Sequence, residues 1–224
     1  MAHYHFITYG TESHTYHALQ IAKTAKIIGE FDFTEVMSPE NIDEDFKFKN
    51  VAILKNHIGA GYWLWKPYII LKKLESLNDG DILCYCDSMY LFRDSIKNIK
   101  IDDNDIYLTH NKPNEGTYKE LWFSKRDALI LMNADSSEYY ESLQVWGGFI
   151  ILRKTPKILQ FISEWLIYAQ DDRIITNNPS TLGKEYSEFR ENRHDQTVLS
   201  LLAKKWKLEF HDFPKNLLFN IRVN

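Results

Sequence analysis

The chain has 224 residues and a mass of 26.5 kDa, which is enough for one large domain that folds without disulfides or a structural metal. Hydrophobic residues make up 44% and charged residues 26% of the chain, a composition typical of globular proteins. Lysine and arginine total 27 against 31 aspartates and glutamates, so the net charge is −4 with no polybasic block. A nucleic-acid partner is therefore not expected.

Membrane insertion and secretion are not indicated by the sequence. No apolar run approaches the ~18 residues of a membrane span, and residues 1–6 carry no signal or transit pattern. Cys84 and Cys86 are the only cysteines and lie two apart in a strand-like run. We interpret them as buried thiols, which favours a reducing cytosol. We therefore expect the protein to be cytoplasmic and to lack a membrane span.

Strand and helix patterns alternate along the first half of the chain. The predicted elements are strands at 3–9 and 33–37, helices at 13–28 and 67–77, and a strand at 81–87. The run 81–87 is apolar until it ends in Asp87, as expected of a central parallel strand.

The second half continues the same alternation. The predicted elements are a strand at 106–109, a helix from Ser124 to Met132, a strand at 145–152, a helix at 156–169, a helix capped by Asn192, and a final strand at 208–210. There are no repeats or linkers. We expect an α/β fold over 1–224, with a mixed, mostly parallel sheet flanked by helices.

The first motif is the run from Gly59 to Pro67, GAGYWLWKP. Pro67 disfavours the helical conformation at Lys66, so we expect Lys66 just outside the helix, beside its positive end. An anion such as phosphate would stabilise an ammonium group placed there. The alternative is a solvent-facing lysine, with Trp63 and Trp65 as core residues.

The second motif is the strand end at Asp87 and Ser88. A carboxylate at this position supplies a hard oxygen ligand for Mg²⁺ or Mn²⁺ beside a diphosphate, or else it hydrogen-bonds the following turn. Ligands of parallel sheets bind at the carboxyl ends of the strands. The residues after the first strand, Thr8, Tyr9 and Gly10, are candidates for the same reason.

Two further motifs lie in the second half of the chain. Gly147 and Gly148 interrupt a predicted strand, which indicates a bulge, a close ligand approach, or packing against a bulky neighbour. Asn192 and Asp195 nearly match a capping box, so a structural role for Asp195 competes with a catalytic one.

Taken in this order, the motifs resemble those of small GT-A-fold glycosyltransferases, including a chlorella-virus type. The run GAGYWLWKPYIILKKLESLNDGDILCYCDS resembles their Gly-Tyr-Trp-x-Trp-Lys segment and the strand that ends in a metal-binding aspartate. WGGFIILRKT and NRHDQTVLSLL resemble their acceptor-side strand and His-Asp-Gln helix. The resemblance covers roughly residues 4–210. It implies one Rossmann-like GT-A domain, with about 1–110 binding a nucleotide sugar and about 111–224 facing the acceptor.

The resemblance also implies roles for individual residues. The implied enzyme is a hexosyltransferase-type glycosyltransferase that moves a sugar from a nucleoside diphosphate sugar, a UDP-sugar in particular, to a hydroxyl of a glycan or other acceptor. The implied donor-binding residues are Thr8, Tyr9, Gly10, Lys66, Asp87 and Ser88, and the implied acceptor-side residues are Trp146, Gly147, Gly148 and His194. Asp195 is the implied general base of an inverting reaction.

One position departs from the family pattern. GT-A enzymes typically carry Asp-x-Asp at the strand end, whereas this chain has Asp87-Ser88-Met89. The implied Mn²⁺ or Mg²⁺ would rest on Asp87, with His211 as a distant second ligand. Because this carboxylate is missing, one alternative function is a non-catalytic carbohydrate- or nucleotide-binding module of the same fold. A third possibility is an interaction protein with an aromatic-rich surface. The other histidines, among them His14 and His57, show no ligand spacing and are expected to be ordinary polar residues.

Overall fold

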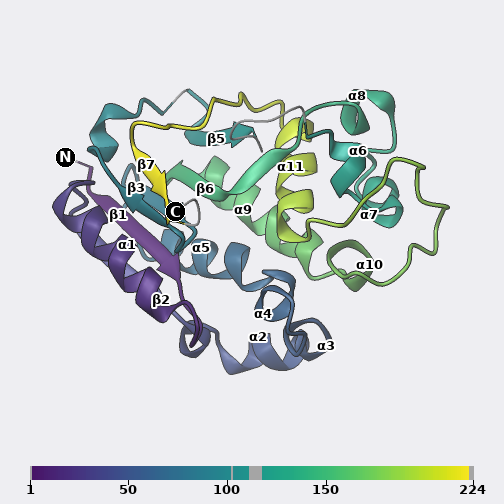
Figure 1. The fold of residues 1–224 in the computed structure, drawn as a ribbon, viewed down its shortest axis with the longest axis horizontal. Helices are drawn as coiled ribbons and strands as arrows, with labels where there is room; N and C mark the ends of the chain where they lie inside the picture. The colour runs from purple at the N-terminus through teal and green to yellow at the C-terminus, as the bar shows by residue number, and fades with distance from the viewer. Residues whose placement is uncertain (1, 102, 111–117, 222–224) are drawn as a thin grey trace.

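The computed structural model describes residues 2–101, 103–110 and 118–221, and a five-stranded sheet forms its centre (Figure 1). The strands are β1 (Tyr4–Tyr9), β2 (Phe33–Met37), β3 (Ile82–Cys86), β5 (Ile106–His110) and β6 (Val145–Arg153). They lie in the order β2-β1-β3-β6-β5. β1 pairs in parallel with β2 and β3, while β6 runs antiparallel between β3 and β5. Four strands therefore share one direction, which confirms the mixed, mostly parallel sheet.

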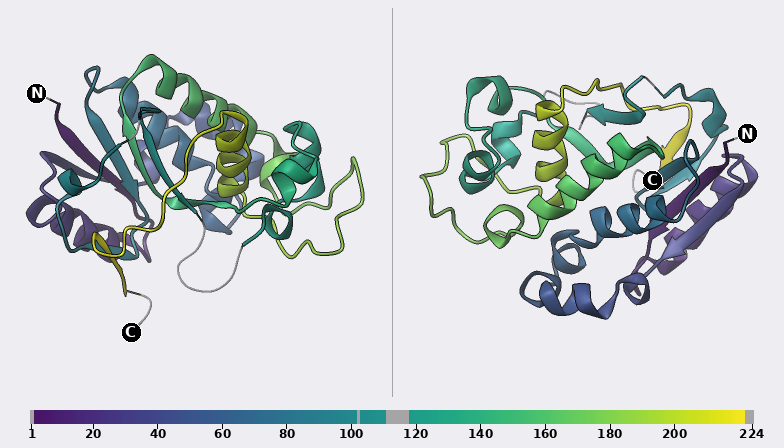
Figure 2. Two further views of the ribbon diagram at one scale, coloured as in Figure 1. Left: turned by 90° about the horizontal axis from the view of Figure 1, so that it is seen from above. Right: turned by 180° about the vertical axis from the view of Figure 1, so that it is seen from behind.

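Helices cover both faces of this sheet (Figures 1 and 2). The long helices are α1 (Thr15–Ile27), α5 (Trp65–Glu75), α9 (Pro156–Ala169) and α11 (Asp195–Lys205). Alternate strand residues point to opposite faces, so Ile7 and Leu83 pack in a core with α5, α9 and α11. Phe6 and Cys84 pack in a second core with α1. Cys86 joins Cys84 on that face, and both thiols are free and buried, as predicted.

Short elements complete the described chain. They are α2 (Glu44–Lys49), α3 (Val51–Leu54), α4 (Gly59–Tyr62), α6 (Glu120–Phe123), α7 (Arg126–Leu131), α8 (Ser137–Tyr140), α10 (Asp172–Ile175), the 3-10 turns η1 (Pro39–Asn41) and η2 (Ile96–Asn98), and a two-stranded sheet of β4 (Tyr90–Phe92) and β7 (Leu218–Asn220). Over residues 2–101, 103–110 and 118–221, none of the helices combines the length and the apolar character that a bilayer crossing requires. The proposed boundary between the two halves, near residue 110, adjoins residues 111–117, which lie outside the described residues.

The end of the chain differs from the prediction of a strand at 208–210. The amide of Leu208 donates to the carbonyl oxygen of Ala203, so this backbone terminates α11 instead of entering the sheet. One isolated bridge joins Thr109 to His211, and the last described strand, β7, forms ten residues later than predicted.

Two predicted helix caps are also wrong. α7 begins at Arg126, because Ser124 ends α6 and its hydroxyl donates to the buried carboxylate of Glu120. α11 begins at Asp195, because the Asn192 amide donates to carbonyl oxygens at the end of α10. Tertiary contacts therefore take both polar side chains away from the helices they precede.

Lys66 lies inside α5, and the prediction that Pro67 would exclude it from the helix is wrong. α5 begins at Trp65, so Pro67 occupies the third helical position. The first N–H groups of a helix have no intrahelical partner, and a proline there sacrifices no hydrogen bond. The helix can therefore start two residues earlier than the proline suggests.

Side-chain truncation in the core around α9 should lower the stability of the fold strongly. Phe161 on α9 is fully buried and packs against Trp206 with ring centroids 5.3 Å apart. We expect Phe161→Ala to lower the free energy of unfolding in urea by about 3–5 kcal/mol. The matched control is Phe48→Ala on α2, where the side chain is 83% exposed and the change should stay within about 0.5 kcal/mol. Equal effects of the two substitutions would contradict this packing.

Candidate active site

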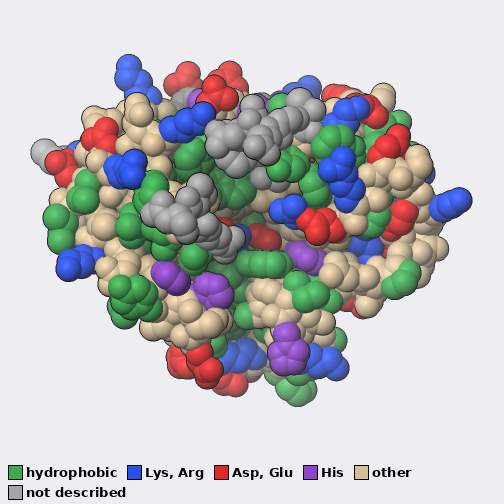
Figure 3. Space-filling view, viewed as in Figure 1, with side chains coloured by type: hydrophobic (Ala, Val, Ile, Leu, Met, Phe, Trp, Pro, Cys, Tyr) green, Lys and Arg blue, Asp and Glu red, His purple; other side chains and the backbone are tan. Residues whose placement is uncertain are grey.

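A pocket of about 310 Å³ opens at the carboxyl ends of β1 and β3. Its lining residues are Tyr9, Thr11, Ser13, His14, His57, Gly59, Ala60, Trp63, Trp65, Tyr85, Asp87, Ser88 and Met89. Figure 3, which is viewed from the same side as Figure 1, shows a hollow near the middle of the molecular surface, with histidine and carboxylate side chains beside it. Ligands of parallel sheets bind where the strands end, and the structure has a cavity there with aromatic walls and a polar mouth.

Only part of the predicted donor set lines this pocket. Tyr9, Asp87 and Ser88 do, whereas Thr8 is fully buried and Gly10 is not among the lining residues. The amide of Gly10 donates to Met37 on β2, which directs the chain past the end of β1 before it turns into the pocket.

Sequence reasoning missed several lining residues. Thr11, Ser13 and His14 follow the end of β1 by a few positions, so the same strand-end rule, applied over a longer segment, identifies them. His57 and Trp63 flank the glycine-containing motif and also line the cavity. The sequence has no separate signal that sets His57 apart from an ordinary polar histidine.

Two stacked rings form the inner wall. Tyr9 and Trp65 stack with centroids 3.8 Å apart and planes 13° from parallel. The Trp65 Nε1 donates to the carbonyl oxygen of Gly59 at 2.9 Å. This hydrogen bond ties α5 to the α4 segment, so the aromatic wall and the loop that faces it are held together.

The α4 segment adopts an uncommon backbone conformation. Gly59, Ala60, Gly61 and Trp63 all have left-handed φ values, between 50° and 96°. A Cβ on Gly59 would lie 2.3 Å from the Trp63 ring, so glycine is required there by packing as well as by φ. Left-handed non-glycine residues are energetically costly and persist only where surrounding contacts hold them.

An ionic cluster lies beside the pocket, centred on Lys66. Its Nζ is 3.0 Å from Asp195 Oδ2 and 3.5 Å from Asp87 Oδ1, and it donates to the carbonyl oxygen of Gly147 at 3.1 Å. Lys66 is only 3% exposed. A lysine ammonium has three donors, and three oxygens surround this one. Lys66 therefore meets two carboxylates of its own chain, where the sequence predicted a phosphate.

The cluster shifts the proton affinities of its members. Burial raises the pKa of Asp195 to about 6, against the opposing effect of Lys66. Burial lowers the pKa of Lys66, but Asp195 and Asp87 raise it by more, so the pKa is above its ordinary value. The ammonium is therefore charged at neutral pH. Asp87 Oδ1 also accepts a hydrogen bond from the Tyr85 hydroxyl at 2.7 Å, which fixes its orientation.

The two glycines of β6 lie in a bulge, and one of them also packs against a bulky neighbour, so two of the three interpretations of the sequence apply. Leu108 of β5 lies opposite Ile150, but the next residue, Thr109, lies opposite Trp146, so β6 has extra residues between them. A Cβ on Gly148 would lie 2.2 Å from the Trp146 indole, which makes glycine necessary there. A Cβ on Gly147 would lie 3.6 Å from Asp195 Oδ2, an ordinary contact distance. Gly147 thus leaves space for a methyl group beside this carboxylate, which is itself buried, since Asp195 is only 3% exposed.

His194 joins the α4 segment to the start of α11. Its Nδ1 donates to the carbonyl oxygen of Ile175 at 2.7 Å, and its ring lies 4.8 Å from Tyr62 and 5.4 Å from Trp63. Burial lowers the pKa of His194, which favours the neutral ring. Its φ of 57° and ψ of −119° are unusual for a non-glycine residue. The residue next to Asp195 is therefore held by packing in a strained conformation.

The metal site expected from the resemblance is incomplete in the side chains that the structure describes. Asp87 is the one carboxylate of the pocket lining, and one of its oxygens already faces Tyr85 and Lys66. His211 lies flat against Tyr107, with centroids 4.3 Å apart. Among residues 2–101, 103–110 and 118–221, no three His, Cys, Asp or Glu side chains are grouped to hold a metal ion. The metal roles of Asp87 and His211 stay predictions.

Removing the central cation should destabilise the fold. Lys66→Met leaves the Asp195 carboxylate buried without its partner, and we expect a loss of about 3–5 kcal/mol in the free energy of unfolding. Adding Asp195→Asn to Lys66→Met removes the unpaired charge and should restore part of that stability. Urea denaturation of the two single variants and the double variant measures this coupling. Strictly additive losses would contradict the ion pair.

No family model matches the sequence, and no curated protein does. Solved structures do match the fold. A glycosyltransferase involved in the glycosylation of the major capsid of PBCV-1 aligns with a TM-score of 0.53 at 12% identity, over 99% of this chain and 94% of that one. The WbbM bifunctional glycosyltransferase aligns with a TM-score of 0.50 at 9% identity, over 90% of this chain but only 37% of its own length. The chain therefore has the GT-A fold of glycosyltransferases.

Proposed function

We propose that this protein is a glycosyltransferase of the hexosyltransferase type, which transfers a sugar from a UDP-sugar to a hydroxyl of a glycan or other acceptor. The observation that carries the proposal is the Lys66 cluster at the edge of a pocket formed by the ends of β1 and β3, within a GT-A fold. The cytoplasmic location suggested by Cys84 and Cys86 stays a prediction.

The donor fits the pocket as follows. The base and ribose lie against the aromatic wall near Tyr9 and Trp65, where a planar ring finds a flat apolar surface. The hydroxyl-bearing residues Thr11 and Ser13 supply hydrogen-bond partners at the mouth. The diphosphate extends toward Ser88, next to Asp87. Lys66 is too buried to contact phosphate freely, so its contribution is to offset the charge of Asp87 beside the diphosphate.

Asp195 is the proposed general base. As the acceptor oxygen attacks the anomeric carbon and the bond to the diphosphate breaks, the hydroxyl proton passes to Asp195 Oδ2 from the side of Gly147. The acceptor must therefore enter the space that this glycine leaves beside the buried carboxylate. A carboxyl with a pKa of about 6 is better matched to this task near neutral pH than an ordinary aspartate. If the reaction retains configuration instead, the leaving phosphate takes the proton and Asp195 serves to hold Lys66.

The second candidate function is a non-catalytic carbohydrate- or nucleotide-binding module of the same fold. The described part of the pocket lining has one carboxylate, Asp87, which favours this function because GT-A enzymes typically have two at this strand end. The two functions differ in donor turnover. A transferase slowly releases UDP from a UDP-sugar in water, whereas a binding module releases none.

Nucleotide binding tests the donor assignment. We expect UDP to raise the melting temperature in the presence of Mn²⁺ more than GDP or CMP does, by an amount equivalent to ~2.7 kcal/mol at 100 times its dissociation constant. Titration calorimetry with Mn²⁺ or with EDTA then measures the metal contribution. Because Asp87 is the one carboxylate among the described residues that line the pocket, Asp87→Asn should abolish the gain from Mn²⁺.

The control for this experiment is Asp79→Asn, since Asp79 is an exposed acid in the turn before β3. It should leave both the UDP affinity and the Mn²⁺ effect unchanged. Equal shifts with all nucleotides would contradict the uridine assignment. An Asp87→Asn variant that keeps its Mn²⁺ dependence would locate the metal elsewhere.

Transfer kinetics test Asp195. If it is the base, Asp195→Asn should reduce sugar transfer by roughly 10²–10⁴-fold while the UDP affinity persists, because the amide cannot accept the proton. Transfer is measured as UDP release with acceptor present, and UDP affinity by calorimetry. A near-normal rate would assign Asp195 a structural role only.

Gly147→Ala is an independent variant for the same test. Gly147 is not among the left-handed glycines, and the added methyl meets Asp195 Oδ2 at 3.6 Å without a clash. The fold and the UDP affinity should survive, while transfer falls because the methyl group fills the space beside the carboxylate that the acceptor has to enter. Unchanged transfer in this variant would show that the acceptor does not approach Asp195 from that side.

A further inference from the structure

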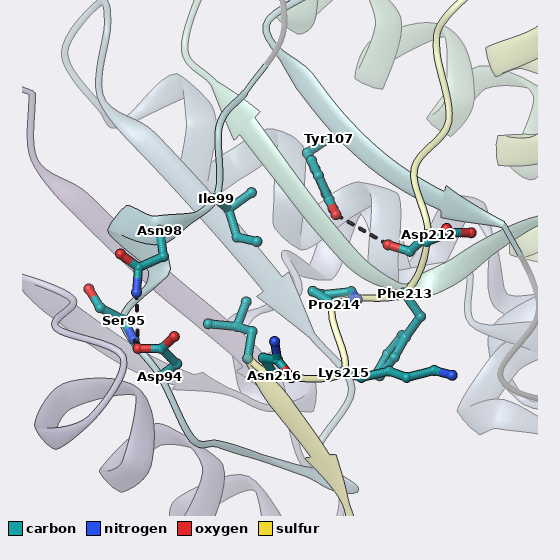
Figure 4. Close-up of a pocket in the computed structure, with 11 residues that line it drawn as sticks. Asp94, Ser95, Asn98, Ile99, Tyr107, Asp212, Phe213, Pro214, Lys215 and Asn216 are labelled. Atoms are coloured by element: carbon teal, nitrogen blue, oxygen red, sulfur yellow. Dashed lines mark hydrogen bonds between the residues drawn. The ribbon is translucent and has the colours of Figure 1, made fainter.

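A second cavity, of about 730 Å³, lies apart from the donor pocket (Figure 4). One wall is the η2 segment, with Asp94, Ser95 and Asn98, and the other is the chain from Asp212 to Leu217 that leads into β7. Tyr107 of β5 lies between the two walls, and its hydroxyl donates to the carbonyl oxygen of Asp212 at 3.2 Å. The role proposed for the donor pocket does not involve this cavity.

The lining has the chemistry of a site for uncharged sugars. Ile99, Leu217 and Phe213 supply apolar surface on which the C–H faces of a pyranose can pack. Asp212 and Asn216 are exposed at the rim and can hydrogen-bond hydroxyl groups. Mixed aromatic and carboxylate or amide surfaces of this kind suit polyhydroxylated ligands.

The charge of the cavity argues against a second nucleotide site. Its lining has two carboxylates, Asp94 and Asp212, and one ammonium, Lys215. Asp94 Oδ1 is already occupied by hydrogen bonds from the Ser95 amide and the Asn98 side chain. A diphosphate would meet net negative charge here, whereas a neutral glycan would not.

Aromatic side chains connect this cavity to Tyr90, which lies next to the donor pocket. Phe213, which lines the cavity, lies 5.4 Å from Trp146 between ring centroids, and Tyr90 lies 5.2 Å from Trp146. Trp146 is followed by Gly147, whose carbonyl oxygen accepts from Lys66. Trp146 and Phe213 are both partly exposed. A ligand in the cavity can therefore extend along these rings toward Tyr90, which directly follows the donor-pocket residue Met89.

We infer that this cavity binds the distal sugar units of a neutral oligosaccharide acceptor, whose terminal hydroxyl reaches the mouth of the donor pocket past Trp146 and Tyr90. The inference rests on the proposed function, and it narrows the acceptor class from any hydroxyl compound to an uncharged glycan of several units. Phe213 and Asp212 are the residues that recognise its length.

The test compares tetrasaccharides with their monosaccharides. The probes are cellotetraose, chitotetraose, mannotetraose and xylotetraose, with binding to the full chain measured by saturation-transfer NMR and calorimetry. At least one tetrasaccharide should bind tenfold or more tightly than its monosaccharide. Phe213→Ala should remove that gain, and Phe48→Ala on α2, where the side chain is 83% exposed, should not.

Asp212→Asn is a second variant, because Asp212 is exposed and its replacement leaves the core untouched. It should weaken the same tetrasaccharide at least threefold even if Phe213→Ala proves unstable. The inference is overturned if no tetrasaccharide in the panel outbinds its monosaccharide, or if neither variant changes the gain.

UDP titration of the same samples separates the two proposals. If UDP binds normally but no tetrasaccharide binds more tightly than its monosaccharide, only the proposal of a glycan site in this cavity is rejected. Tetrasaccharide binding that depends on Phe213, without UDP binding, rejects the transferase proposal and leaves a glycan-binding module.

Discussion

Burial of the Lys66 ammonium constrains the arrangement of the candidate site. An isolated buried charge is very unfavourable, so it must be matched by oxygens in close contact. These oxygens come from Asp87 after β3, Gly147 on β6 and Asp195 at the start of α11. Three elements thus converge on the lysine of α5. Any shift of α11 or of the β6 bulge would leave a buried charge unmatched.

Strain accumulates around this cluster and is held there by packing. The left-handed α4 segment faces His194, whose own backbone is unusual, and the rings of Tyr62, Trp63 and His194 lie against one another. A neutral His194 anchored on Ile175 fixes the residue before Asp195. Strained residues concentrate at functional sites because only a dense set of contacts can hold them. The aromatic packing therefore orients Asp195 as much as its ion pair does.

The two glycines of the β6 bulge have different roles. Gly148 is needed because the Trp146 indole lies over it, whereas Gly147, on our proposal, leaves space for the acceptor beside Asp195. Within the same bulge, Trp146 packs against the rings of Tyr90 and Phe213, and the carbonyl oxygen of Gly147 accepts from Lys66. One irregularity in a central strand thus contributes both to the ionic cluster and to the aromatic contacts beside the larger cavity.

Local sequence patterns were sufficient to predict the alternation of strands and helices and the buried strand that ends in Asp87, and to mark Gly147 and Gly148 as an irregular point in a strand, with a bulge as one of three interpretations. The surroundings of Lys66, in contrast, depend on contacts that form only in the folded chain. Its partner Gly147 is 81 residues away, and no local rule connects the two. The prediction of Asn192 as a helix cap and the prediction of a strand at 208–210 were wrong for the same reason. In each case the hydrogen-bonding group pairs with a backbone carbonyl that the local pattern did not indicate. Local propensity therefore specifies the elements of this fold, and the need to match buried charge specifies how they meet.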